Sequence, residues 1–168
     1  PGDVVLVESP TYDLALDLFR AQHLKLIGCP TDAAGMQVEL LEPLLQQHHP
    51  KLIYTIPNFQ NPTGITLSLA GRQALLHAAH AAGVPVVEND PYGDLRYSGE
   101  PVAAIKALDE GGGTVLLRSF SKVSFPGLRV GWVRTGKQLR RRINTAAQLS
   151  VASPSALDDL LAQAIVQK

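Results

Sequence analysis

Short apolar runs alternate with longer amphipathic segments along this chain. Residues 4–8 (VVLVE) and 51–56 (KLIYTI) are the clearest runs, because apolar and β-branched side chains fill almost every position. Such runs are typical of strands that are buried on both faces of a sheet. Similar runs predict further strands over residues 24–29, 84–88 and 128–134, and another within residues 111–119.

Helical periodicity fills the segments between these strands. It runs over residues 12–22, 38–49 and 68–83. Pro43 predicts that the second helix starts near it, since proline fits the first turn of a helix. Ser68 is expected to cap the start of the third helix, and Gly83 is expected to end it. The last part of the chain predicts helices over residues 137–149 and from residue 155 onward.

Strands that alternate with helices of this length predict βαβ units. We therefore expect an α/β fold, a three-layer α/β/α domain with a mostly parallel sheet, and we find no linker that divides the chain in two. In open sheets of this kind, ligands bind beyond the carboxyl ends of the strands. Functional residues are therefore expected directly after each strand.

The charge balance and the cysteine count narrow the function classes. Lys plus Arg and Asp plus Glu each number 15, so the chain lacks the positive charge of a nucleic-acid-binding domain or a membrane-surface protein. No apolar run approaches the roughly 20 residues of a membrane span. Cys29 is the one cysteine, which excludes an internal disulfide, favours a cytoplasmic location and leaves no cysteine-based metal site. No metal site is expected.

Polar side chains follow four of the predicted strands. The segments are SPTY at 9–12, PNFQNPTG at 57–64, NDPY at 89–92 and RSFSK at 118–122. Because the carboxyl ends of parallel strands meet at one edge of the sheet, we expect their polar groups to lie close together. The candidate site residues are Tyr12, Asn61, Asp90, Tyr92, Ser119, Ser121 and Lys122, and Arg129 follows shortly.

Together these groups suit one ligand. A lysine amine can form an imine with an aldehyde. Serine hydroxyls and a guanidinium can hold a phosphate. An aspartate can pair with a ring nitrogen, an amide and a phenol can bind a ring oxygen, and an aromatic ring can stack on the ligand. Aldehyde, phosphate, pyridine nitrogen and phenolic oxygen all occur in pyridoxal 5′-phosphate (PLP), which we therefore expect as the cofactor.

Three motifs, in chain order, carry a resemblance to a known family. NPTG at 61–64, ENDPYGDLRY at 88–97 and SFSKVSFPGLRVGW at 119–132 resemble those of fold-type I, class I/II PLP-dependent aminotransferases. The nearest likeness is to the 2-aminoadipate and kynurenine aminotransferase branch, and to the aminotransferase-like domain of MocR-type GntR regulators. The resemblance covers nearly the whole chain. It implies the large, PLP-binding domain of that fold.

The resemblance implies catalytic roles for residues of these motifs. Lys122 matches the lysine that forms the internal aldimine with PLP and carries the proton between the substrate Cα and the cofactor. Asp90 is expected, by the same resemblance, to be the partner of the pyridine nitrogen and to keep it protonated. Tyr92 and Asn61 are expected to donate hydrogen bonds to the phenolic oxygen.

The remaining candidates are expected to hold the cofactor in place. The resemblance implies that Ser119, Ser121 and Arg129 bind the phosphate. Tyr12 falls where the family places the aromatic residue that stacks on the ring. Ser9–Pro10 and Asn61–Pro62 are implied to be cis peptide bonds, which are uncommon even before proline.

The resemblance also implies parts that this sequence does not contain. The chain enters a strand almost at once and stops within a helical pattern, so we expect residues 1–168 to be a fragment of the large domain. The family's N-terminal segment with its phosphate loop and its C-terminal small domain, with the arginine for the substrate carboxylate, would lie outside it. Because the family builds its sites at a dimer interface, we expect a homodimer of the full-length protein and an inactive isolated fragment.

Three functions remain open from the sequence. The first is an aminotransferase that moves an amino group between an L-amino acid and a 2-oxo acid. The second is a PLP- and amino-acid-sensing domain of a GntR/MocR-type transcriptional regulator, which would contact DNA only through an upstream winged helix. QNPTG and NDPYGDL favour the enzyme over the regulator. The third is another PLP reaction, such as that of a lyase or decarboxylase, because fold and cofactor do not fix the reaction.

Overall fold

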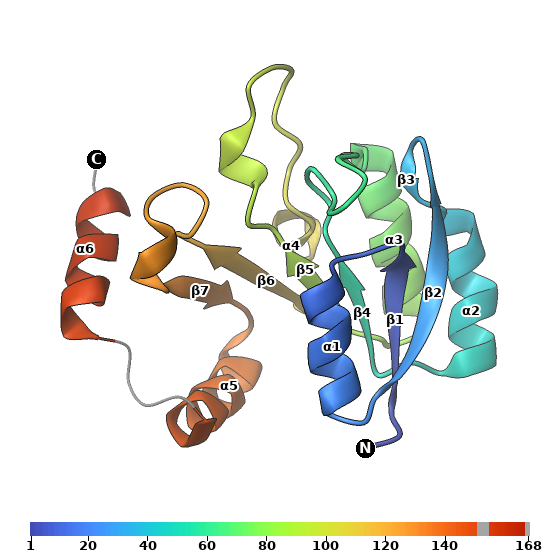
Figure 1. Ribbon diagram of the computed structural model, residues 1–168. Coiled ribbons are helices and arrows are strands. Elements are labelled where there is room, and N and C mark those ends of the chain that lie inside the picture. Colours follow the sequence, from blue (N-terminus) through green and yellow to red (C-terminus); the bar gives the residue numbers. More distant parts are fainter. Residues whose placement is uncertain (151–154, 167–168) are drawn as a thin grey trace.

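A seven-stranded sheet forms the centre of the computed structural model, which describes residues 1–150 and 155–166 (Figure 1). The strands are β1 (Val4–Ser9), β2 (Lys25–Asp32), β3 (Gly35–Met36), β4 (Leu52–Thr55), β5 (Val86–Asn89), β6 (Thr114–Ser119) and β7 (Gly131–Arg134). The helices are α1 (Asp13–Ala21), α2 (Leu41–His48), α3 (Leu69–Ala81), α4 (Ile105–Leu108), α5 (Lys137–Ser150) and α6 (Ala156–Val166).

The sheet has the order β3-β2-β1-β4-β5-β6-β7. Strands β2, β1, β4, β5 and β6 are parallel, whereas β3 and β7 pair antiparallel to β2 and β6 at the two edges. The mostly parallel sheet is therefore confirmed. The chain moves from β1 outward to β2 and then back past β1 to β4, so the loops after β1 and β4 diverge and open a crevice between them.

Two apolar layers cover the two faces of the sheet. Helix α1 packs on one face, where Phe19 meets Tyr54 edge-on with ring centroids 5.5 Å apart. Helices α2, α3 and α4 pack on the other face, around Leu6, Ile53 and Val86 and the inward side chains of α2 and α3. The division is visible in Figure 1, where α1 and α2 lie on opposite sides of β1 and β2. The three-layer arrangement is thus confirmed for this part of the chain.

Helix α3 begins and ends where the sequence indicates. Its N-cap is Ser68, whose hydroxyl oxygen accepts a hydrogen bond from the Gly71 backbone N–H at 3.1 Å. Gly83 follows the last turn with a φ of +65°, a left-handed conformation that glycine adopts without a steric cost. Pro43 lies in the first turn of α2, as predicted, because a 3₁₀ turn over Val38–Leu40 precedes that helix.

Some predicted boundaries differ from the structure. Strand β5 begins at Val86 and includes Asn89, so the predicted strand over 84–88 is shifted by one to two residues. The predicted strand over 128–134 is shortened to β7, because a 3₁₀ turn at Pro126–Leu128 occupies the preceding residues. The two residues of β3 and the single turn of α4 are too short for a periodic pattern and were not predicted.

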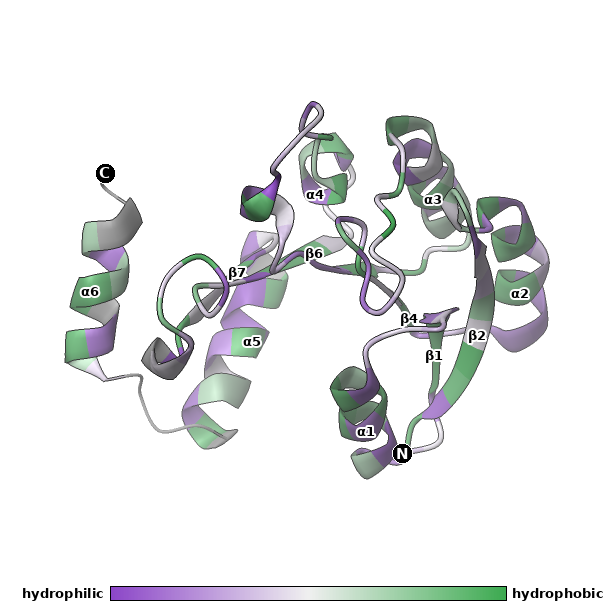
Figure 2. Cartoon of the chain, turned by 45° about the horizontal axis from the view of Figure 1, so that its top comes forward, coloured by the Kyte–Doolittle hydropathy of each residue, from purple (hydrophilic) through white to green (hydrophobic). Residues whose placement is uncertain are grey.

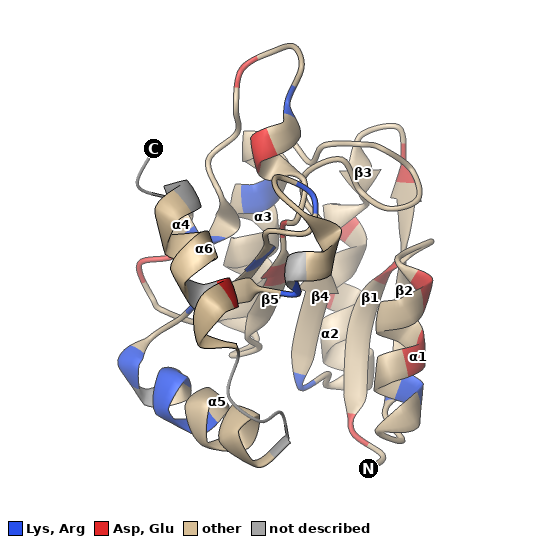
Figure 3. Cartoon of the chain, turned by 60° about the vertical axis from the view of Figure 1, so that its left-hand side comes forward, with Lys and Arg blue, Asp and Glu red and all other residues tan. Residues whose placement is uncertain are grey.

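Helix α5 differs in character from the sheet region. Figure 2 shows many hydrophilic positions on α5, whereas β1 is largely hydrophobic. Lys and Arg positions cluster on α5 in Figure 3. Arg140, Arg141 and Arg142 of this helix are exposed. The basic run is therefore a solvated helix face. The predicted final helix is α6, and residues 167 and 168 of that prediction lie outside the described part of the chain.

A buried guanidinium joins the sheet to the segments above it. Arg72 of α3 is completely buried, and charged side chains are rarely buried without partners. Its N–H groups donate to acceptors in three separate segments: the Leu67, Pro57, Val102 and Ala103 carbonyls and Asn58 Oδ1. Arg72 therefore fixes the loop after β4 relative to α3, and that loop carries a candidate site residue.

Candidate functional site

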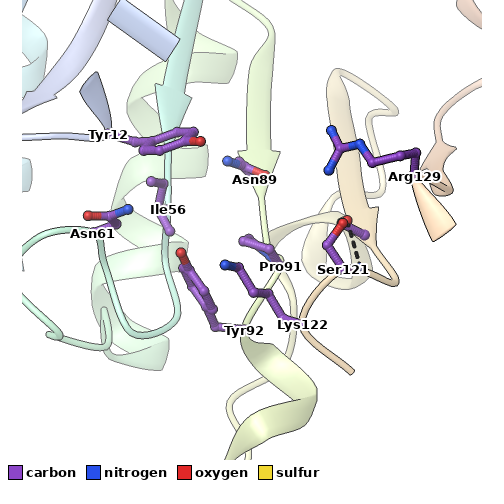
Figure 4. A pocket seen from close by; sticks show the side chains of 10 residues that line it. Tyr12, Ile56, Asn61, Asn89, Pro91, Tyr92, Ser121, Lys122 and Arg129 are labelled. Atoms are coloured by element: carbon purple, nitrogen blue, oxygen red, sulfur yellow. Dashed lines mark hydrogen bonds between the residues drawn. The ribbon is translucent and has the colours of Figure 1, made fainter. Parts of the chain in front are cut away.

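Seven of the eight predicted site residues line one cavity of about 350 Å³ (Figure 4). A volume of this size is within the range of small-molecule sites. The seven are Tyr12, Asn61, Tyr92, Ser119, Ser121, Lys122 and Arg129. Asn89, Ile56 and Pro91 complete the lining, and Asp90 is not part of it. The fold thus gathers residues that are up to 117 positions apart in the sequence.

The cavity lies at the carboxyl edge of the parallel strands. Tyr12 follows β1 and stands at the N-cap position of α1, and Asn61 lies in the loop after β4. Tyr92 comes directly after β5, and Ser119 is the last residue of β6. Ser121, Lys122 and Arg129 lie in the turns that lead from β6 to β7. This is the place where open α/β sheets bind ligands.

Two loops with cis prolines bring Tyr12 and Asn61 to the cavity. Ser9–Pro10 and Asn61–Pro62 are both cis, as the family resemblance implied. A single side chain, Gln60, connects these loops. Its amide N–H group donates to the Pro10 carbonyl oxygen at 2.8 Å, and its amide oxygen accepts from the Thr63 backbone N–H and hydroxyl at 3.0 Å and 2.8 Å.

Glu8 lies beneath both loops and holds them to the sheet. Its carboxylate accepts hydrogen bonds from the Thr55 hydroxyl at 2.7 Å, the Ile56 backbone N–H at 3.1 Å and the Gln60 amide at 3.2 Å. Burial raises the pKa of Glu8 to about 7, although these three donors act in the opposite direction. The buried Glu8–Gln60 pair was not predicted, because the two residues are 52 positions apart and no local sequence pattern connects them.

The lining of the cavity favours an anionic ligand. Two cationic side chains, Lys122 and Arg129, line it, and no Asp or Glu is among the described lining residues. The Ser119 hydroxyl accepts a hydrogen bond from the Ser121 backbone N–H at 3.1 Å, which orders the turn between β6 and Lys122. In Figure 4, Arg129 and Ser121 lie together on one side of the cavity, whereas Asn61 and Tyr92 lie on the other.

The Asp90 carboxylate lies outside this cavity. The Asp90 side chain is fully buried, and one oxygen accepts from the Asn58 amide at 2.9 Å. The other oxygen accepts from the Arg118 guanidinium at 2.7 Å. Arg118 also forms two 2.7 Å hydrogen bonds to Asp94. The structure therefore places Asp90 in an internal ion-pair network, because successive side chains along an extended segment point to opposite faces of a sheet.

Asn89 lines the cavity, whereas the sequence prediction had placed its neighbour Asp90 there. The Asn89 amide N–H donates to the Tyr54 hydroxyl oxygen at 2.7 Å. The signal that identifies Asn89 is the alternation in VVEND, which sets residues 87 and 89 on one face and residues 88 and 90 on the other. The predicted strand ended at Glu88, so this alternation was not extended to Asn89.

The chain belongs to the class I and II aminotransferases. The profile of this family, described as "Aminotransferase class I and II", matches residues 1–167. The aromatic-amino-acid aminotransferase 1 of Thermococcus litoralis is 44% identical over 153 residues, covering 88% of this chain and 37% of that protein. An uncharacterized HTH-type transcriptional regulator of Bacillus subtilis, YisV, is 37% identical over 130 residues, covering 77% of this chain and 27% of that protein.

Solved structures agree with the fold described above. The α-aminoadipate aminotransferase LysN from Thermus thermophilus, complexed with N-(5′-phosphopyridoxyl)-L-leucine, superposes with a TM-score of 0.95 at 31% identity. The match covers 99% of this chain and 44% of LysN. The fold-type I likeness is therefore confirmed, and the chain spans less than half the length of these relatives.

No helix in the described residues is both long and apolar enough to cross a membrane.

The raised pKa of Glu8 predicts a pH-dependent contribution to stability. The folded carboxyl keeps its proton up to about pH 7, whereas the unfolded one releases it near 4.5. The folded state then binds more protons between these values, so the free energy of unfolding falls as pH rises through this window, by roughly 3 kcal/mol at most. Glu8→Gln preserves the shape of the side chain and removes its titratable proton. The new amide N–H can donate to the Thr55 hydroxyl oxygen, so the local contact is kept.

Urea unfolding at a series of pH values measures this contribution. Relative to wild type, Glu8→Gln is expected to gain stability progressively from about pH 4.5 to about pH 7 and to keep that gain at higher pH. Glu110→Gln, at an exposed position, is the matched control and should remain parallel to wild type. Stability curves of Glu8→Gln and wild type that stay parallel across this range would contradict the assignment.

Proposed function

We propose that this chain is part of a PLP-dependent aminotransferase that moves an amino group between an L-amino acid and a 2-oxo acid. The observation that carries this proposal is one cavity, in a class I and II aminotransferase chain, that combines the Lys122 amine with anion-binding groups. The donors in the cavity match the aldehyde, phosphate and phenolic oxygen of PLP. The residues present therefore fit this cofactor.

The cofactor phosphate would bind on one side of the cavity. Ser119 and Ser121 supply hydroxyl donors there, and Arg129 supplies a guanidinium with a fork of N–H donors. Tyr92 and Asn61, on the opposite side in Figure 4, donate to the phenolic oxygen. Tyr12 covers one face of the ring. These contacts would hold the cofactor in a single orientation relative to Lys122.

Lys122 is the proposed catalytic base and covalent anchor. Bound PLP supplies an aldehyde that bonds amines and a ring that withdraws electrons from the substrate Cα. The Lys122 amine, freed by the incoming amino acid, would take the proton from the substrate Cα and return it to the carbon that carried the aldehyde. Tyr12 and Ile56 limit the access of water on their side of the cavity.

We further propose that the chain is the central portion of the large domain of a longer protein. Its matches cover 37% and 44% of the relatives compared above, which leaves room for a phosphate loop segment and a small domain. A homodimer is proposed because the loops after β5 and β6 keep large apolar side chains exposed, among them Tyr97 at 96% and Phe125 at 72%. A cytoplasmic location is proposed from the single thiol, Cys29.

A second candidate is an amino-acid-sensing domain of a transcriptional regulator. The 37% identity to an HTH-type regulator favours it specifically. The same cavity would then bind PLP through Lys122 and respond to an amino acid without releasing a 2-oxo acid. At this cavity the two candidates differ in whether a 2-oxo acid product is formed, so a single-turnover experiment separates them.

Lys122→Ala is expected to abolish covalent cofactor attachment in the complete protein. Borohydride reduction in the presence of PLP, followed by digestion and mass spectrometry, should give a pyridoxyl group on Lys122 in wild type and none in the variant. Single-turnover mixing with L-amino acids should release 2-oxo acid equal to the bound cofactor, at least about 100-fold more slowly in the variant, since it lacks its acid–base group.

Lys25→Ala, at an exposed position of β2, is the matched control and should retain both signals. Release of oxo acid by Lys122→Ala at the wild-type rate would contradict the role of Lys122. A wild type that forms the adduct with Lys122 but releases no oxo acid would favour the sensing domain instead.

Arg129→Ala is expected to weaken PLP binding by about 10- to 100-fold, which corresponds to the loss of a charge-assisted hydrogen bond. Fluorescence titration with PLP and with pyridoxal, which lacks the phosphate, isolates this contact. The affinity for pyridoxal should stay within a few fold of wild type, and Arg20→Ala, an exposed arginine of α1, should bind both compounds like wild type. Equal losses for PLP and pyridoxal would contradict a phosphate contact.

A further inference from the structure

The last residues of β5 divide between the two faces of the sheet. Val87 packs in the apolar layer beneath α1, together with Val5 and Tyr54. Val86 and Glu88 are buried on the opposite side, where Glu88 accepts hydrogen bonds from the start of α4. The alternation of strand side chains then sets Asn89 on the α1 side, which is also the side of the cavity.

The pairing between β5 and β6 shows the same division. Asn89 is paired with Leu117 across the two strands, so Ser119, two residues further on, lies on the same face as Asn89. Asp90 and Arg118 lie on the other face and bond to each other there. Both faces of this edge are therefore occupied, one by the cavity and the other by an ion-pair network.

The Asn89 amide forms one hydrogen bond within the protein and can form others with a ligand. One amide N–H donates to the Tyr54 hydroxyl oxygen at 2.7 Å, and within the described residues the amide forms no other side-chain hydrogen bond. Burial raises the pKa of Tyr54 to about 12, so its hydroxyl stays neutral near pH 7. The amide oxygen and the second N–H hydrogen remain for a ligand in the cavity.

Elimination identifies the ligand atom that Asn89 meets. In PLP the ring nitrogen lies opposite the aldehyde carbon, and the phenolic oxygen and the phosphate arm flank that carbon. The proposed function gives Lys122 to the aldehyde, Asn61 and Tyr92 to the phenolic oxygen, and the serines and Arg129 to the phosphate. Tyr12 covers the ring face, so among the described residues that line the cavity Asn89 is the polar side chain left without a ligand atom.

We propose that Asn89, a neutral carboxamide, is the partner of the cofactor's ring nitrogen in this protein. The inference rests on the proposed function and goes beyond it, because it assigns the ring-nitrogen contact to a residue that carries no charge. A carboxylate favours a protonated ring nitrogen through charge–charge attraction, whereas a carboxamide offers only a hydrogen bond. Asp90, with both oxygens bonded to Asn58 and Arg118, does not supply that charge to the cavity.

The consequence is a weaker electron sink than a carboxylate partner would give. An unprotonated ring withdraws electrons less strongly, so removal of the substrate Cα proton by Lys122 is expected to be slow in wild type. Asn89→Asp introduces the missing charge at the cavity and is expected to accelerate this step. The substitution exchanges one amide for one carboxylate of the same size, so steric effects are minimal.

Equilibrium binding tests the contact without relying on activity. The complete protein is titrated with PLP and with its carbocyclic analogue, in which a CH group replaces the ring nitrogen. Wild type is expected to prefer PLP by no more than about 10-fold, the value of a neutral hydrogen bond. Asn89→Asp is expected to widen that preference by a further 10-fold or so, because the contact becomes charge-assisted.

Two further variants complete the test. Asn89→Leu is expected to remove the preference for PLP over the analogue, and Asp90→Asn, in protein shown by circular dichroism to be folded, should leave it as in wild type. The inference would be overturned if PLP still binds but the preference for PLP over the analogue is unchanged in both Asn89 variants. It would also be overturned if that preference changes in Asp90→Asn instead. Failure of wild type to bind either compound would overturn the proposed function and the inference with it.

Discussion

The alternation of side chains along β5 is the constraint on which the site depends. A strand sends successive residues to opposite faces, so one register decides which polar groups meet a ligand and which are sealed beneath it. In this chain the register gives Asn89 to the cavity and Asp90 to the interior. A shift of one residue would reverse that choice and would also expose the apolar layer under α1.

Buried polar groups on the sealed face keep the loops of the site in place. Glu8 and Gln60 connect the loops after β1 and β4, and Arg72 joins the second loop to α3. Asn58 then links Arg72 to Asp90, which continues to Arg118 on β6. Glu8, Gln60, Asn58, Arg72 and Asp90 are buried and bond to one another or to nearby backbone groups, where an unpaired polar group is costly. The cavity is therefore assembled on a connected, largely buried network.

Much of this arrangement could be predicted from the sequence, because apolar runs and helical periodicity report burial directly. Predicted strand ends located six residues of the cavity, Lys122 among them, and Arg129 follows shortly in the chain. The choice between Asn89 and Asp90 depends on a single residue at the end of β5, and the sequence pattern does not define a strand end that closely. The Glu8–Gln60 contact joins residues 52 positions apart, which periodicity cannot detect.

A crystal structure of the complete protein with PLP bound would test the central claim most directly. We predict that the cofactor is bonded to Lys122, that its phosphate lies against Ser119, Ser121 and Arg129, and that its ring nitrogen faces the Asn89 amide. Asp90 would keep its contacts with Asn58 and Arg118. A cofactor bound elsewhere, or an Asp90 carboxylate turned to the ring nitrogen, would contradict this account.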